Sequence, residues 1–216
     1  MSRCKSETRE GVGPRVAWKH PGRSDLSRLT VKLLAGSALL LTVVGVGDRQ
    51  LMASTDTAFE YEVKAAFLFR FAQFVEWPPE TFKGTLEPFT YCTIGDDPFH
   101  GALERTMNGK TIGQRSLRVE HLNGVKKIAE CQVLFFGGAE EKKQMEEMLG
   151  SAGTLPILTV GEADQFAKSG GAIGFCTEDN KIRFEVNLEA AGKAGLKISA
   201  KLLALAKTVL GAPKGT

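Results

Sequence analysis

The sequence predicts one α/β domain, in which helices alternate with the strands of a largely parallel sheet. A run at residues 131–136 (CQVLFF), apolar except for Gln132, is typical of a strand that is buried on both faces of such a sheet. Apolar residues at helical spacing occur before and after the strand-like segments. Two strand-like segments flank Glu178, Asp179 and Asn180, and this turn signal predicts an antiparallel hairpin at one edge of the sheet.

The first 53 residues have the composition of an export signal, so we expect the domain to span residues 54–216. Residues 33–47 (LLAGSALLLTVVGVG) form an uncharged apolar run that is shorter than the roughly 20 residues of a membrane-spanning helix. A basic region precedes this run, as in secretory signal peptides, and its unusual length leaves the true start of translation open. An uncleaved membrane anchor is the alternative. The basic residues are Arg15, Lys19, Arg23, Arg28 and Lys32, and the candidate cleavage positions are Ala53, Ser54 and Ala58.

The positive charge of the chain belongs to this N-terminal segment. The whole chain carries a net charge of +3, but residues 1–53 hold nine Lys and Arg against four Asp and Glu. The remaining residues hold 19 basic and 21 acidic side chains, which gives the domain a net charge of −2. A slightly acidic domain lacks the basic surface of nucleic-acid binders, so we expect no nucleic-acid partner.

The first element of the domain is predicted to be a helix over residues 59–75. The following Trp77-Pro78-Pro79 ends it, because proline cannot continue a helix. Its polar sector carries one aromatic residue, Phe69, and we predict that Phe69, Arg70 and Gln73 form part of a contact surface for a protein partner. A helix buried on two sides is the alternative. The apolar stripe is formed by Val63, Phe67, Phe71 and Phe74.

The other elements follow from alternation, apolar runs and turn signals. Asp97 and Pro98 are expected to cap and begin the second helix, and Asn108-Gly109 to form the turn after it. Strands are expected at residues 89–95, 116–122, 131–136, 156–160, 172–177 and 181–187. Helices are expected at residues 99–107, 140–149 and 199–210, with a short turn or helix at 161–168.

The residues that could bind a phosphate or a metal are better explained as structural. A strand followed by Gly137-Gly138 and a helix could form a phosphate loop, but Glu140 and Glu141 in the first turn would repel a phosphate. Asp96 and Asp97 could hold a divalent cation, although Asp97 already serves as a cap. His100 and His121 are too few and wrongly spaced for a metal-ligand signature. We therefore expect no cofactor and no metal.

A catalytic arrangement is not indicated either. A cysteine nucleophile would need Cys176 beside His100 or His121, and the sequence places none of these together. Ser151, Ser169 and Ser199 have no nucleophile-elbow context. We therefore expect a protein that is not an enzyme.

Three segments together resemble the YfiR family, also known as the DUF4154 family. They are residues 61–82 (YEVKAAFLFRFAQFVEWPPETF), residues 157–161 (ILTVG) and residues 170–206 (GGAIGFCTEDNKIRFEVNLEAAGKAGLKISAKLLALA). The resemblance covers about residues 59–209. It implies a periplasmic protein with a three-layer αβα, Rossmann-like fold that self-associates, which makes a homodimer the expected state.

The resemblance also implies a function. The understood relatives repress an inner-membrane diguanylate cyclase by binding its periplasmic sensing domain, which lowers cyclic di-GMP. An OmpA-like outer-membrane lipoprotein can sequester them and release the cyclase. The alternative is a periplasmic small-molecule-binding module that serves a histidine kinase or a transporter. Such a module would use the crevice at the strand ends near residues 95–99 and 137–139.

The expected export determines how the cysteines are interpreted. Removal of the signal takes Cys4 with it and leaves three cysteines, of which two would pair in an oxidising compartment while the third stays free or buried. The resemblance implies that the pair is Cys92 and Cys131, which lie on the first and third predicted strands of one sheet. Cys176 falls within a strand without a nearby partner, so we expect a buried structural residue.

Overall fold

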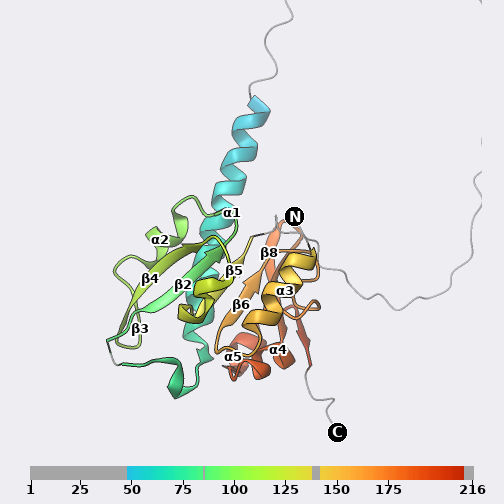
Figure 1. Cartoon of the computed structure of the whole chain (residues 1–216). Helices are drawn as coiled ribbons and strands as arrows, with labels where there is room; N and C mark the ends of the chain where they lie inside the picture. The colour runs from blue at the N-terminus through green and yellow to red at the C-terminus, as the bar shows by residue number, and fades with distance from the viewer. Residues whose placement is uncertain (1–47, 85, 138–141, 212–216) are drawn as a thin grey trace, which may run out of the picture.

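The computed structural model describes residues 48–84, 86–137 and 142–211 as one α/β domain around an eight-stranded sheet (Figure 1). The strand order is β10-β8-β7-β6-β5-β2-β4-β3, and most neighbouring strands run parallel. Helices pack on both faces, so the predicted three-layer αβα class with a largely parallel sheet is confirmed. The strands are β2 (Phe89–Ile94), β3 (Thr111–Ile112), β4 (Arg115–Leu122), β5 (Val133–Phe136), β6 (Leu158–Gly161), β7 (Ile173–Glu178), β8 (Lys181–Asn187) and β10 (Thr208–Leu210).

Two hydrophobic cores lie on the two faces of the sheet. The first core lies beneath the helices α1 (Asp48–Gln73), α2 (Ala102–Met107), α4 (Leu188–Lys193) and α5 (Ala200–Leu203). The second core lies beneath α3 (Lys142–Ala152) and the 3-10 helix η2 (Val125–Glu130). A two-stranded sheet of β1 (Val75–Glu76) and β9 (Lys197–Ile198) and a 3-10 helix η1 (Pro79–Thr81) complete the described elements.

Strand β5 shows why an uninterrupted apolar run belongs at the centre. Val133 and Phe135 contribute to the core under α1, whereas Leu134 and Phe136 contribute to the core under α3. Successive side chains of a strand point to opposite faces, so a strand covered by helices on both faces has no polar positions. The prediction of a doubly buried strand is confirmed.

The hairpin between β7 and β8 is also confirmed. Its two turn residues, Asp179 and Asn180, have φ angles of 49° and 56°. Positive φ at both positions is the geometry of the two-residue turn that matches the twist of antiparallel strands, and Asp and Asn tolerate it well. This hairpin is one strand removed from the edge, because β10 pairs in parallel with β8. At the opposite edge, β3 and β4 form a second antiparallel hairpin.

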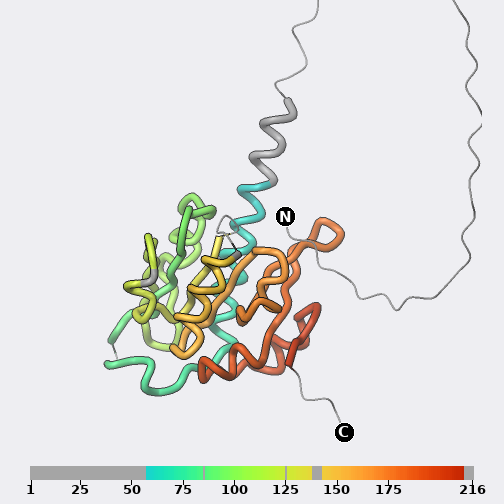
Figure 2. The backbone as a smooth tube through the Cα atoms, turned by 45° about the vertical axis from the view of Figure 1, so that its right-hand side comes forward, coloured from blue at the N-terminus to red at the C-terminus, as the bar shows by residue number. Residues whose placement is uncertain are grey.

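The prediction of a helix over residues 199–210 is wrong. Only Ala200–Leu203 are helical, and Thr208–Leu210 form β10. Long-range pairing decides this segment: Val209 is in register with Val186, and the Lys207 amide donates to the Phe184 carbonyl at 2.9 Å. In Figure 2 the chain from α4 to β10, in red, lies on the side of the domain that carries the β7–β8 hairpin, in orange.

Helices α1, α2 and α3 also differ from the predicted bounds, and α3 continues to Ala152 instead of ending at residue 149. Helix α2 begins at Ala102 rather than at residue 99, because the Asp97 carboxylate accepts the Phe99 amide at 3.0 Å in a local turn. His100 and Gly101 then take positive φ angles of 48° and 80°, which no α-helix contains. Helix α1 begins at Asp48 and ends at Gln73, and Val75 joins β1 instead of extending the helix.

Within the residues that the structure describes, no helix combines the length and the apolar character needed to cross a bilayer. Two parts of the chain with predicted features lie outside the described ranges. Residues 1–47 contain the apolar run of the expected signal, and residues 138–141 contain Gly138 and the first two residues of the helix predicted at 140–149.

Candidate functional site

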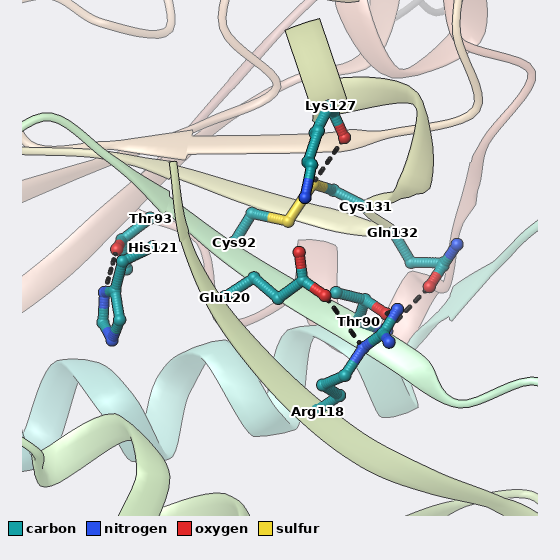
Figure 3. The surroundings of a disulfide bond; sticks show 9 residues. All are labelled: Thr90, Cys92, Thr93, Arg118, Glu120, His121, Lys127, Cys131 and Gln132. Carbon is teal, nitrogen blue, oxygen red and sulfur yellow. Dashed lines mark hydrogen bonds and ion pairs between the residues drawn. A yellow bond between two sulfur atoms is a disulfide. The ribbon is translucent and has the colours of Figure 1, made fainter. Parts of the chain in front are cut away.

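A disulfide bond joins Cys92 of β2 to Cys131, which directly precedes β5 (Figure 3). The two alpha carbons are 5.9 Å apart, within the range that a disulfide spans. Both residues are 1% exposed and belong to the core beneath α3. The bond therefore closes a loop of 39 residues from within a buried layer, and the predicted pairing is present in the structure.

Cys176 is buried in β7, as expected, with an exposure of 7%. It carries no free thiol in this structure.

The three predicted contact residues of α1 differ in their surroundings. Phe69 is half-buried against the first core, and the Lys110 ammonium lies 4.7 Å from its ring centroid. Arg70 and Gln73 are exposed, and Arg70 donates a hydrogen bond of 3.0 Å to the Gln73 side chain. The structure therefore brings Arg70 and Gln73 together on an exposed helix face and gives Phe69 a partner within the chain. Their role in binding another protein stays a prediction.

A cavity of about 740 Å³ opens at the carboxyl ends of the central strands. The chain after β2 leads to α2 on one face, whereas the chain after β5 leads towards α3 on the other face. The crevice between two such strands is where α/β folds of this kind bind ligands. Asp96, Asp97, Pro98 and Gly137 line the cavity from these two strand ends, as the sequence predicted for this crevice. The predicted crevice residues 138 and 139 lie outside the described ranges.

A buried lysine and its partners form one wall of this cavity. Lys64 of α1 is only 5% exposed, and its ammonium pairs with Glu60 at 2.6 Å and with Glu162, which follows β6. Tyr61 donates a hydrogen bond of 2.9 Å to Glu162, and the Lys64 ammonium lies 4.4 Å from the centroid of the Tyr61 ring. Four side chains from two distant segments thus form one connected polar cluster.

The environment of Tyr61 favours its neutral form. Burial raises the pKa of the Tyr61 phenol well above its ordinary value, and the negative charge of Glu162 and its hydrogen bond to the hydroxyl raise it further. A phenol held neutral remains a hydrogen-bond donor, which suits its contact with Glu162.

The local sequence pattern does not predict this cluster, although it contains one signal of it. Positions 64, 68, 71 and 75 follow one another at intervals of three or four residues, which is the spacing of one helix face. Lys64 is the charged residue in this series, and the other three are Leu68, Phe71 and Val75. Its partner Glu162 lies 98 residues away, and no local pattern connects the two positions.

The remaining candidate residues are dispersed. His100 lines the cavity, whereas His121 hydrogen-bonds Thr93 and Glu104, each at 2.7 Å. Cys176 also lines the cavity, but without a free thiol it cannot act as a nucleophile. Among the described residues, no group of three or more His, Cys, Asp or Glu side chains is arranged to hold a metal ion.

Fold and site together define a disulfide-closed, three-layer α/β domain with an acidic cavity at its topological switch point. The chain belongs to the YfiR/HmsC-like family, whose family model, DUF4154, matches residues 61–207. Membership in this family identifies a YfiR-type regulator, and such proteins are generally not enzymes.

Proposed function

We propose that this protein is a periplasmic regulator that represses an inner-membrane diguanylate cyclase through the periplasmic sensing domain of that cyclase. The observation that carries the proposal is the family match over residues 61–207, which includes the second half of α1 and every strand of the eight-stranded sheet except β10. The Cys92–Cys131 disulfide supports a periplasmic location, because such bonds persist in oxidising compartments. The basic and apolar N-terminal segment supports export.

Repression would act through binding alone. From the sequence we expect no phosphate loop, arginine clamp or metal cluster with which the protein could make or hydrolyse a phosphodiester. A bound protein shifts its partner towards the inactive state only by its differential affinity for the two states. The exposed Arg70 and Gln73 on α1 are our proposed part of the contact surface, and an OmpA-like lipoprotein would compete for the same protein. A homodimer is the proposed functional state.

Deletion of the gene tests the proposal. We expect deletion to raise cyclic di-GMP and biofilm matrix, and an exported copy to restore both to the original level. A copy without residues 1–53 should not restore them, because it does not reach the periplasmic face of the membrane. Unchanged cyclic di-GMP after deletion, under oxidising and reducing conditions alike, would refute the proposal.

A paired variant tests the contact surface. An exported Arg70→Ala/Gln73→Ala protein should accumulate normally, because both side chains are exposed, but should fail to lower cyclic di-GMP. The matched control is Lys143→Ala/Glu147→Ala on α3, which removes an equally exposed pair from the opposite face of the sheet. Equal repression by both variants would show that this face of α1 does not contact the cyclase.

The alternative function is a small-molecule-binding module for a histidine kinase or a transporter. One observation favours it: a cavity lies at the strand ends where such a module would bind its ligand. The gene neighbourhood separates the two functions. An adjacent gene for a membrane protein with a periplasmic domain and a cyclase domain favours the repressor.

A further inference from the structure

The cavity at the carboxyl ends of β2, β5 and β6 is strongly acidic. Among the described residues that line it, Lys64 is the only lysine or arginine, against five carboxylates. Lys64 is already shared by Glu60 and Glu162, so the described part of the lining holds more carboxylates than ammonium groups. An anionic ligand would be repelled from such a site, whereas a cation would reduce the repulsion among the carboxylates. The five carboxylates are Glu60, Asp96, Asp97, Glu162 and Asp164.

The size of the cavity and its apolar lining suit an organic ligand. Its volume of about 740 Å³ lies within the range of small-molecule sites. Tyr61 and Phe175 contribute aromatic surface, and the Tyr61 ring packs edge-on against Phe99 with the centroids 5.5 Å apart. A bare metal ion is a poor fit, because the described carboxylates are not arranged as a metal-binding group.

The side chain of Lys64 shows how this cavity can hold an ammonium group. The Lys64 ammonium lies between two carboxylates and over an aromatic ring, with its charge almost fully removed from solvent. An ammonium binds in such a place through charge-assisted hydrogen bonds and through attraction to the face of the ring. Asp96 and Asp97 present the same acceptor chemistry at the more exposed end of the cavity.

From this geometry we infer that the cavity is a binding site for a small aliphatic amine with one or two primary ammonium groups. Asp96 and Asp97 accept hydrogen bonds from the ammonium, and Tyr61 and Phe175 contact its carbon chain. The site lies at the topological switch point, where ligands bind in related folds. The inference concerns this cavity alone and holds whether or not the protein represses a cyclase.

Isothermal titration of the oxidised protein with 1,4-diaminobutane tests the inference. We expect saturable binding that weakens as the salt concentration rises, and no binding of the uncharged analogue 1,4-butanediol. Asp96→Asn and Asp97→Asn should each weaken binding at least about fivefold, because each removes one charged acceptor at a partly solvated site. Asparagine at position 97 can still accept the Phe99 amide, so the local turn persists in that variant.

The matched control is Glu130→Gln, which removes one exposed carboxylate from η2. This residue precedes β5 and therefore lies at the opposite end of the sheet from the cavity. The control should bind 1,4-diaminobutane like the unaltered protein. Absence of saturable binding, equal binding by all variants, or binding of magnesium or calcium chloride in place of the amine would each overturn the inference.

Discussion

Lys64 is a charged residue on a face of α1 where the residues that follow it, Leu68 and Phe71, are apolar. Its ammonium is compensated by Glu60 and Glu162, whose side chains are only 14% and 12% exposed. Removing one partner from a buried ion pair leaves an uncompensated charge, which costs more than the pair contributes when it is complete. The cluster therefore constrains which residues α1 can carry at this position.

Replacement of Lys64 should destabilise the domain. We expect Lys64→Met to lower the free energy of unfolding by about 3 kcal/mol, because Glu60 and Glu162 then face each other without a cation. Urea denaturation at neutral pH measures the change. Lys143→Met is the control, because Lys143 is 87% exposed and should change the stability by no more than about 0.5 kcal/mol. A loss in Lys64→Met no larger than in the control would contradict the structural role of the cluster.

The two tyrosines of the chain predict how stability depends on alkaline pH. Burial raises the pKa of both Tyr61 and Tyr91 above the ordinary 10.0, and the charge of Glu162 contributes at Tyr61. A group whose folded-state pKa is raised contributes its full stability below the unfolded-state pKa. We therefore expect the protein to lose stability as the pH rises above about 10.

The phenolate absorbance in the near ultraviolet checks this expectation. The native protein should show no tyrosine ionisation at a pH where the protein unfolded in denaturant has ionised both residues. Ionisation of either tyrosine near pH 10, with the fold intact by circular dichroism, would show that the phenol is solvated.

Among the elements, β2 and β5 depend on the disulfide as well as on their pairing. Cys92 lies within β2, opposite Leu134 of β5 in register, while Cys131 lies three residues before Leu134. The bond thus fastens the entry of β5 to the middle of β2. Because the cysteines are 39 positions apart in sequence, with α2, β4 and η2 between them, the bond restricts a large part of the unfolded chain.

Loss of this bond should destabilise the domain without changing its fold. The chain-entropy model gives roughly 3–4 kcal/mol for a loop of this length, so Cys92→Ala/Cys131→Ala should lower the free energy of unfolding by about that amount. Chemical denaturation of the variant and of the oxidised protein provides the comparison. A reductant should destabilise the unaltered protein far more than the variant, and an equal effect on both would show that another bond is responsible.

The elements that sequence predicted are those whose local pattern and tertiary environment agree. The run CQVLFF predicts β5 because two helix layers cover it, and Asp179-Asn180 predicts its turn because the backbone angles are local. Thr208–Leu210 became a strand through pairing with β8, which no helical stripe could reveal. The cavity shows the same difference. The sequence predicts Asp96 and Asp97 at the cavity because they directly follow β2. It does not predict the pairing of Lys64 with Glu162, because that pairing depends on the packing of α1 across the sheet.

At the scale of the whole molecule, the expected export signal overlaps the N-terminal part of α1. The helix begins at Asp48, within the segment expected to contain the signal, but the described core residues of α1 begin with Lys64 and Ala65. Phe59 is 68% exposed. Cleavage between Ala53 and Phe59 would therefore shorten the helix without removing any residue known to contribute to the core.

We therefore expect the mature protein to begin between Ala53 and Phe59 and to carry the Cys92–Cys131 disulfide. N-terminal sequencing of protein from the periplasmic fraction measures the first property, and thiol labelling before and after reduction measures the second. A copy without residues 1–53 is the control: it keeps the described core and should remain in the cytoplasm with Cys92 and Cys131 reduced, because reducing systems there keep thiols free. Recovery of an intact Met1 form from the cytoplasm would contradict export. Free thiols at both positions in periplasmic protein would contradict the disulfide. Without export the domain could not reach a periplasmic partner.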